Sequence, residues 1–273
     1  MSALLITDQN ADEQQRMARA RLNGHELYGV EGCKKNFTTY GCIPGVQPAS
    51  FRFPRIPREQ WREILKLQKG TFLGDFTRGK LPPHDQGRTN YCWGHGSIRS
   101  IETLSVFYGQ QPTLLSAESV CVPVTGGKNR GGSPEEALNQ LIKFGCCEQS
   151  YWPHNELDVR KAKEGWQHNA LSHRILQWVE LENFDDQMTL AIRRQPVAIG
   201  LGWWGHLVCQ LDPVFLDDFP ELDSYERASG GFGIGFDNSW GAGYGDNGYA
   251  YLDEKHATSD LGAFSPIGVT FAG

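Results

Sequence analysis

The chain has 273 residues, of which 39% are hydrophobic and 21% are charged, and its formal net charge is −6. This length and composition are typical of a globular protein with one large domain or two lobes, and the acidic balance argues against a nucleic-acid partner, which usually meets a basic face. No stretch approaches the roughly 20 apolar residues that cross a bilayer, so we expect no membrane partner.

The N-terminal part of the chain differs from the rest in its residue composition. We expect residues 1–75 to form an N-terminal extension and residues 76–273 to form the main domain. A short apolar run over residues 3–6 lacks the basic flank of a signal peptide, so a cytoplasmic location is predicted. A polar helix is predicted over residues 12–23, and a Gly- and Pro-rich stretch follows over residues 29–57.

Helix signals dominate the chain up to residue 145. Pro57 opens one helical pattern, and a second helix is predicted to begin near Cys92, because the apolar residues that follow it recur on one face. Ser116 is a good N-cap for a short helix, with an acidic residue in its first turn. Ser133, followed by Pro and then by Glu three residues on, predicts a capping box at the start of another helix.

Strand signals dominate after residue 172. A helix capped by Asp185 or Asp186 is predicted to interrupt them. Turn residues separate the later apolar runs, as antiparallel strands require. Helices followed by strands predict an α+β fold with two lobes and a substrate cleft between them. The predicted strands are residues 172–181, 197–201, 207–211, 233–236 and 249–252.

The chain contains seven cysteines, which is an odd number, and it lacks a secretion signal, so reduced thiols are expected. Cys92 lies between His84 and His95, and such a cluster is one pattern of metal ligands. The chain has no C-x2-C pair, however, and we therefore expect no metal and no cofactor.

Four segments resemble papain-like cysteine peptidases. Residues 86–94, Gln-Gly-Arg-Thr-Asn-Tyr-Cys-Trp-Gly, resemble the segment that carries the nucleophile in that family. Residues 237–249 contain Asp-Asn-Ser-Trp-Gly and a Gly-rich continuation, which resemble the family's Asn segment. Residues 195–199 and 205–208 resemble the strands around the family's His. The segments occur in the family's order, and the resemblance spans roughly residues 81 to 252.

The resemblance implies a Cys–His–Asn constellation in a papain-like two-lobed fold. Cys92 would be the nucleophile, activated by the helix N-terminus and by the imidazole of His206. Asn238 would orient that ring, and Trp240 would shield their hydrogen bond from water. Gln86 would donate its side-chain amide to the oxyanion.

The resemblance also implies a substrate-binding surface. Asn129 begins a segment that resembles the family's Asn-Gly-Gly region, in which Gly131 and Gly132 would present bare backbone to an extended peptide. Trp93 and Trp240 are the other predicted substrate contacts.

Some positions depart from the family's pattern. Thr89 stands where the family commonly has a disulfide cysteine, and Gly205 stands where it often has Asp or Asn. An acidic stretch over residues 212–226 is expected to be a solvated loop, or alternatively a surface that selects basic substrates or docks a partner.

The predicted function is a cysteine endopeptidase that forms an acyl-enzyme intermediate from a peptide or protein substrate. Two alternatives remain open: a papain-fold structural or adaptor protein in a larger assembly, such as a viral particle, and an amidase acting on peptidoglycan. Residues 1–75 would be an inhibitory pro-segment, a permanent lobe or an anchor for an assembly partner, and the last of these would make the protein virion-associated.

Overall fold

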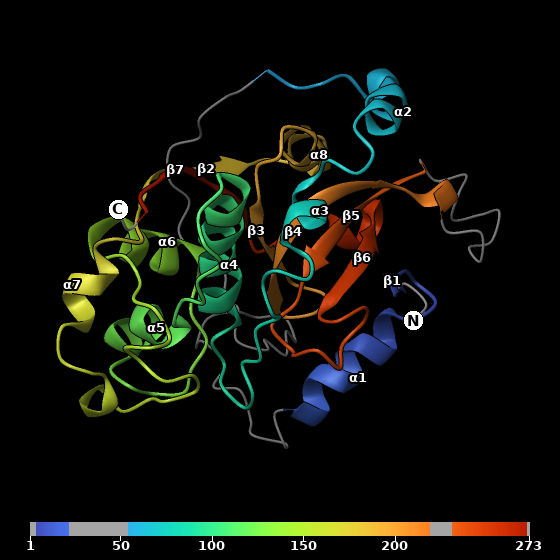
Figure 1. Cartoon of the computed structure of the whole chain (residues 1–273). Coiled ribbons are helices and arrows are strands. Elements are labelled where there is room, and N and C mark those ends of the chain that lie inside the picture. Colours follow the sequence, from blue (N-terminus) through green and yellow to red (C-terminus); the bar gives the residue numbers. More distant parts are fainter. Residues whose placement is uncertain (1–3, 22–53, 219–230, 272–273) are drawn as a thin grey trace.

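The computed structural model describes residues 4–21, 54–218 and 231–271 (Figure 1). Cys33, Cys42 and most of the Gly- and Pro-rich stretch lie outside these ranges, as does the second half of the acidic stretch. Within the described part no helix is long and apolar enough to cross a bilayer.

Helices dominate the first half of the described chain and strands the second. The first half contains β1 (Leu5–Ile6), α1 (Ala11–Arg21), α2 (Arg58–Leu67), α3 (Leu73–Thr77), α4 (Cys92–Phe107), α5 (Ala117–Thr125), α6 (Pro134–Lys143) and α7 (Trp166–Ala170). The second half contains β2 (Ile175–Leu181), α8 (Phe184–Ile192), β3 (Val197–Leu201), β4 (His206–Phe215), β5 (Phe232–Asp237), β6 (Tyr249–Asp253), α10 (Glu254–Ala257) and β7 (Ala263–Val269).

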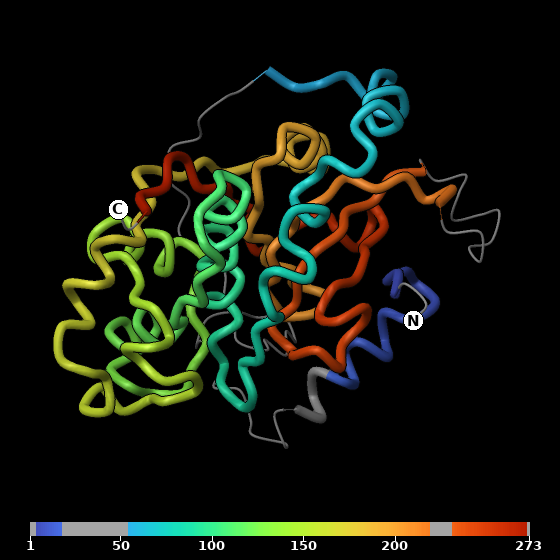
Figure 2. The backbone as a smooth tube through the Cα atoms, viewed as in Figure 1, coloured from blue at the N-terminus to red at the C-terminus, as the bar shows by residue number. Residues whose placement is uncertain are grey.

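The described strands form one seven-stranded sheet in the order β1-β6-β5-β4-β3-β7-β2. The pairings are antiparallel except for β1, which runs parallel to β6. Helix α4 contacts β4 on one side and α5 and α6 on the other. Figure 2 shows this arrangement, with α5, α6 and α7 on one flank of α4 and β4, β5 and β6 on the other. The chain is therefore α+β with two halves that meet along α4, as predicted.

Each half has its own apolar core. One core joins the sheet to α2 and α8 and contains Trp61, Trp204 and Trp240. The other joins α4, α5 and α6 and contains Cys92 and Trp93. The predicted nucleophile therefore belongs to one core, while the tryptophan predicted to shield its partner belongs to the other.

Two glycines let α4 approach its neighbours closely enough to bring these cores together. A Cβ on Gly94 would lie 2.3 Å from the Cys121 sulfur, and one on Gly96 would lie 2.1 Å from Leu207 Cδ2. Real Cβ atoms essentially never lie within 3 Å of such a neighbour. The Gly-x-Gly spacing one turn after Cys92 thus sets the distance from α4 to both α5 and β4.

The described part of the N-terminal region is bound into the body of the molecule. Tyr251 on β6 donates its backbone N–H to Leu4 at 2.8 Å, and Trp61 on α2 is fully buried. Arg55 forms ion pairs with Glu182 and Asp186 near α8. These segments share the core of residues 76–273, while the boundary at residue 75 and the removal of the extension remain predictions.

Several sequence expectations differ in detail from the structure. The helix at α8 is capped by Asn183, whose side chain accepts the N–H of Asp186, and not by Asp185 or Asp186. The capping box at Ser133 is present. Ser116 occupies the N-cap position of α5, but its hydroxyl donates to Glu118 at 3.1 Å and makes no cap bond.

Asp212 was expected in a solvated loop, and this expectation is wrong. It lies in β4 and is 6% exposed, where it accepts hydrogen bonds from the N–H of Gly74 and the hydroxyl of Tyr249. Burial raises the pKa of Asp212 to about 6. The strand continues through Phe215 because apolar residues follow Asp212, so only the later residues of the acidic stretch leave the sheet.

Candidate active site

Cys92 is the first residue of α4 and is fully buried. The backbone N–H groups of Leu207, Trp93 and Cys92 itself favour its thiolate, and Leu207 directly follows His206. Burial outweighs them and raises the pKa of the thiol to about 12. The expected thiolate is therefore not the form that this closed structure favours, because a buried anion loses more water than the helix N-terminus replaces.

His206 and Asn238 meet as the resemblance implied. Nε2 of His206 lies 2.8 Å from Oδ1 of Asn238, and both residues are buried. That contact engages Nε2, so Nδ1 is the ring nitrogen available for proton exchange with a nucleophile. The ring of Trp240 lies 4.9 Å from that of His206, and the ring of Trp204 lies at the same distance. The two indoles fix the plane of the imidazole and exclude water from its bond to Asn238.

Gln86 is held by two side-chain hydrogen bonds. Its amide Nε2 donates to the carbonyl of Thr89 at 2.7 Å, and its Oε1 accepts the hydroxyl of Ser239 at 2.6 Å. Because the amide group carries two N–H bonds, one remains to face an oxyanion. Ser239 also donates its backbone N–H to Asn238 Oδ1 at 2.8 Å. This serine therefore touches both predicted catalytic amides, a role that the motif Asn-Ser-Trp-Gly did not reveal.

Backbone pairing brings the two motif segments together. Gln86 donates its N–H to the carbonyl of Ser239, and Gly241 donates its N–H to the carbonyl of His84, both at 2.8 Å. Asp85 and Trp240 form an antiparallel bridge between these bonds. An isolated β-bridge thus holds the segment before the cysteine beside the segment that carries Asn238.

Three predicted substrate-binding residues, Gly131, Gly132 and Trp93, lie on the helical side, whereas Trp240 is buried in the core of the sheet half. Asn129 accepts the N–H of Asn90 at 2.7 Å and donates its side-chain N–H to Arg88, which ties the glycine segment to the cysteine loop. A Cβ on Gly132 would lie 2.4 Å from the Trp93 ring. Trp93 is fully buried, so it supports the glycine backbone here; contact of Gly131, Gly132 or Trp93 with a substrate remains a prediction.

A buried charged network underlies the site and was not predicted. Arg99 on α4 donates to Asp237 Oδ2 at 2.6 Å and to Glu102 Oε2 at 3.1 Å. Glu102 also contacts Nε2 of His84 at 2.8 Å. Burial acts to raise the pKa of Glu102, but His84, Arg99 and the N–H of Leu115 together hold that pKa below its ordinary value. Glu102 is therefore a carboxylate, and Arg99 links it to the residue that precedes Asn238.

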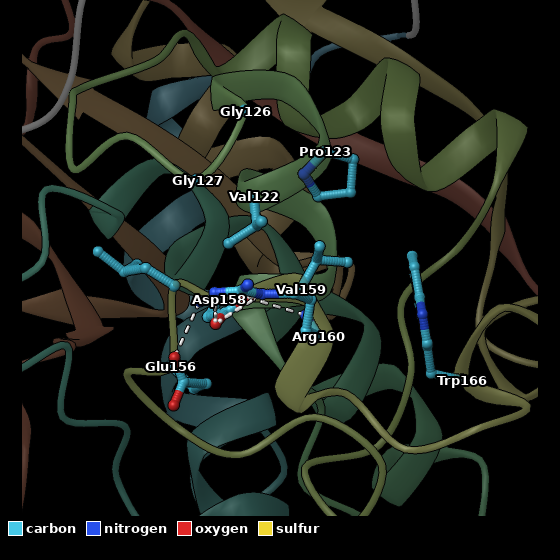
Figure 3. A pocket seen from close by; sticks show the side chains of 10 residues that line it. Val122, Pro123, Gly126, Gly127, Glu156, Asp158, Val159, Arg160 and Trp166 are labelled. Atoms are coloured by element: carbon cyan, nitrogen blue, oxygen red, sulfur yellow. Dashed lines mark hydrogen bonds and ion pairs between the residues drawn. The ribbon is translucent and has the colours of Figure 1, made fainter.

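The candidate site is closed, whereas an open hollow lies elsewhere. Cys92 and His206 are 0% exposed, Asn238 is 2% exposed and Gln86 is 4% exposed. A pocket of about 750 Å³ lies on the helical half and contains none of these residues (Figure 3). It is lined by Val122, Pro123, Gly126, Gly127, Glu156, Leu157, Asp158, Val159, Arg160 and Trp166.

Comparison with known proteins gives matches in structure alone. No family model matches the sequence, and no curated protein sequence matches it. Xylellain, a cysteine protease from Xylella fastidiosa, matches 90% of this chain with 100% of its own, at 16% identity and a TM-score of 0.62. Digestive procathepsin L 3 of Tenebrio molitor larval midgut matches 98% of this chain with 84% of its own, at 15% identity and a TM-score of 0.58.

A third similar structure is the bromelain protease from Ananas comosus in complex with the E64 inhibitor. It matches 70% of this chain with 94% of its own, at 18% identity and a TM-score of 0.52. Identities this low establish a shared architecture and leave the chemistry to be argued from this chain's own residues. The fold predicted from the four motif segments is thereby confirmed, and the chain is a divergent representative of the papain-like fold.

Proposed function

We propose that the chain is a cysteine endopeptidase in which Cys92 attacks the peptide carbonyl, His206 transfers the proton and Asn238 orients the imidazole. The observation that carries this proposal is the 2.8 Å contact between His206 Nε2 and Asn238 Oδ1, on the strand whose Leu207 N–H faces the Cys92 thiol. The fold and the cysteine-protease neighbours support the same reading.

The reaction would proceed in two steps. The thiol proton passes to Nδ1 of His206 while the sulfur bonds to the carbonyl carbon, and the carbonyl oxygen becomes an anion. The Cys92 N–H and the second N–H of Gln86 would stabilise that anion, each contributing about 3 kcal/mol. The imidazolium then returns the proton to the leaving amine. Water, activated by the same ring, hydrolyses the thioester and restores the thiol.

A peptide substrate fits the site better than a small amide does. The backbone of Gly132 packs against the Trp93 ring, and Asn129 ties the same segment to the cysteine loop by hydrogen bonds. Such a fixed, side-chain-free segment can form strand-like hydrogen bonds with an extended peptide. We therefore place the substrate's backbone along this segment.

We further propose that this structure is the latent form of the enzyme. Cys92 is fully buried and burial raises the pKa of its thiol, so neither access nor ionisation favours reaction. One of the similar structures is described as a procathepsin. Catalysis would then require a rearrangement that exposes the sulfur, with residues 1–75 as the inhibitory pro-segment of the alternatives left open above.

Selective labelling of Cys92 by a thiol-directed epoxide tests the proposal. The label is followed by intact mass and peptide mapping at neutral pH, before and after limited proteolysis of the chain. We expect Cys92 to be labelled after proteolysis, Cys92→Ser to stay unlabelled and His206→Ala to react at least about 100-fold more slowly. Cys147→Ser is the control, because Cys147 is another buried free thiol and should leave the label intact. If Cys92 reacts no faster than the other thiols under both conditions, the peptidase proposal is wrong.

Full burial of Cys92 is also the observation that favours a structural or adaptor role. In that case the papain-like fold would bind an assembly partner, in the cytoplasm or in a virion, without turnover. Fluorogenic peptides and cross-linked peptidoglycan fragments, offered to the same proteolysed sample, separate the three functions. Cleavage of peptides alone supports the endopeptidase, cleavage of the fragments alone supports the amidase, and absence of both together with unreactive Cys92 supports the scaffold.

A further inference from the structure

Three potential metal ligands converge beside the candidate active site. His95 is on α4, one turn after Cys92, Glu118 is in the first turn of α5, and His154 is on the connection between α6 and α7. One ligand atom from each residue lies within 4.8 Å of the other two. His95 is 1% exposed, and its ring lies 5.7 Å from that of His154. Three separate segments of the helical half therefore bring two imidazoles and one carboxylate to one point.

Two ring nitrogens of this cluster have unused hydrogen-bonding capacity. Nδ1 of His95 lies 3.2 Å from Nδ1 of His84, so Nε2 is the nitrogen left for the cluster. Among the described residues neither Nε2 of His95 nor Nδ1 of His154 has a hydrogen-bond partner, although both atoms are buried. A buried polar atom without a partner costs about 1–3 kcal/mol. A ligand that binds both ring nitrogens through their lone pairs would remove this energetic penalty.

The neighbours of His95 fix the orientation of its ring. Nε2 of His84 lies 2.8 Å from the carboxylate of Glu102, which can only accept a hydrogen bond. Nδ1 of His84 lies 3.2 Å from Nδ1 of His95, so Glu102, His84 and His95 form one chain of contacts. This chain holds His95 by Nδ1 and leaves Nε2 for a metal. A partner on the second ring nitrogen is what orients a metal-binding histidine.

The carboxylate of Glu118 is oriented in a similar way. Oε1 accepts the backbone N–H of Asn155 at 2.8 Å, and Oε2 accepts the hydroxyl of Ser116 at 3.1 Å. Each oxygen keeps a further lone pair. Asn155 is next to His154, so the same contact fixes the loop that carries the third ligand. This explains why Ser116 donates to Glu118 and makes no cap bond.

We propose that His95, Glu118 and His154 form a Zn²⁺ site with one coordination position open to water. Two imidazoles and one carboxylate are a known donor set for zinc, whereas calcium and magnesium prefer oxygen ligands alone. Bonds of about 2.1 Å in a tetrahedral site place ligands about 3.4 Å apart. The separations within 4.8 Å therefore need small side-chain rotations only. The site uses neither Cys92 nor His206, so it stands whether or not the chain is a peptidase.

Bound zinc would connect α4, α5 and the loop that carries His154. Asn155 of that loop also donates its side-chain amide to the carbonyl of Asp85 at 3.1 Å. Asp85 directly precedes Gln86, the predicted oxyanion donor. Occupancy of the site would thus rigidify the turn before the nucleophile, and we expect zinc to raise the thermal stability of the protein.

The test uses the whole chain with Cys92→Ser, which removes a thiol one turn from His95 that could capture zinc. Zinc binding is measured by calorimetry and by metal content after gel filtration, and Co²⁺ serves as a spectroscopic probe. We expect one zinc per chain, a higher melting temperature with zinc, and a tetrahedral Co²⁺ spectrum without a thiolate band. His154→Ala should weaken binding at least about 100-fold, since losing an outer-shell partner alone costs about 10- to 100-fold.

His168→Ala is the matched control, because His168 is an exposed histidine on α7 outside the cluster. It should bind zinc as the parent does. Ser116→Ala leaves all three ligands in place, removes the hydroxyl that donates to Glu118 Oε2, and should weaken binding about tenfold or more. Equal zinc affinity in the parent and in His154→Ala, a thiolate band in the Co²⁺ spectrum, or no binding at micromolar zinc would each overturn the proposal.

Discussion

Replacing Arg99 by Met should destabilise the protein more than the loss of any surface ion pair. The guanidinium is 4% exposed and donates to two carboxylates, Asp237 at 2.6 Å and Glu102 at 3.1 Å, and to the carbonyl of Pro82 at 3.2 Å. Methionine has a similar length and fills the space, so the cavity contribution is small. The substitution leaves the carboxylates of Asp237 and Glu102 buried without the cation that they share.

The magnitude follows from that uncompensated charge. Breaking a buried ion pair by removing one partner typically costs about 3–5 kcal/mol, because the remaining charge has lost both water and its counter-ion. Glu102 keeps two other partners, His84 and the N–H of Leu115 at 2.7 Å, whereas Asp237 loses its 2.6 Å partner. We therefore expect about 3 kcal/mol, the lower end of the range. Arg99→Lys keeps the charge but cannot reach both carboxylates as a fork does, so its cost should be intermediate.

Urea unfolding followed by tryptophan fluorescence measures this prediction. Arg160→Met is the control, because Arg160 also pairs with an aspartate, Asp158 at 2.7 Å, but that pair is on the surface and should contribute little. The midpoint for Arg99→Met should fall well below that of the control at an unchanged slope. Equal midpoints for the two variants would refute the idea that the buried network supports the site.

Three further predictions concern the core, a buried carboxyl and the oxyanion donor. Trp61→Ala should lower the free energy of unfolding in urea by about 3–5 kcal/mol. Leu67→Ala, on the exposed face of α2, should lower it little, and equal effects would mean that the packing of α2 is dispensable for stability. Asp212 has a raised pKa of about 6, so its stabilising effect is present at acid pH and is lost as pH rises through 6. Asp212→Asn should therefore show a smaller fall in unfolding free energy between pH 4.5 and 7.5, by about 2 kcal/mol, and an unchanged fall would contradict the assignment. If the peptidase proposal holds, Ser239→Ala should lower kcat up to about tenfold with little change in KM or melting temperature, because it frees Gln86 from a hydrogen bond worth about 1 kcal/mol. An equal loss in Gln86→Ala and in the double variant would confirm that the two residues act together.

His206 and Asn238 form the contact that the resemblance implied, and the predicted site residues lie in segments with strong local sequence signals. Cys92 starts a helix whose glycines force close packing, and Asn238 follows a strand and precedes a run of turn glycines. A helix start and a run of turn glycines can be predicted from a sequence, because both depend on neighbouring residues along the chain. The strand β7 was missed for the opposite reason. It contains Pro266 and Gly268, which read as turn residues, and it forms a strand because β2 and β3 pair with it on both sides.

The polar residues of α4 could not be recognised as buried from the sequence. Arg99 and Glu102 have the spacing of a solvated helix face, yet both are buried. Their partners, Asp237 and His84, come from segments more than a hundred residues and about twenty residues away in the chain. No local pattern distinguishes a charge that faces water from one that faces such a partner. For the same reason Glu118 and His154 gave no sequence signal as companions of His95.

Burial of Cys92 acts on access and on ionisation through one physical cause. A pKa of about 12 leaves a thiolate fraction of about 10⁻⁵ at pH 7, because the sulfur is cut off from water. The N–H groups of Leu207, Trp93 and Cys92 already face the sulfur and favour the anion, but the loss of hydration on burial outweighs them. A rearrangement that admits water to the sulfur and keeps these N–H groups in place would lower the pKa of the thiol. In the proposed peptidase, exposure and activation of the nucleophile are therefore one event.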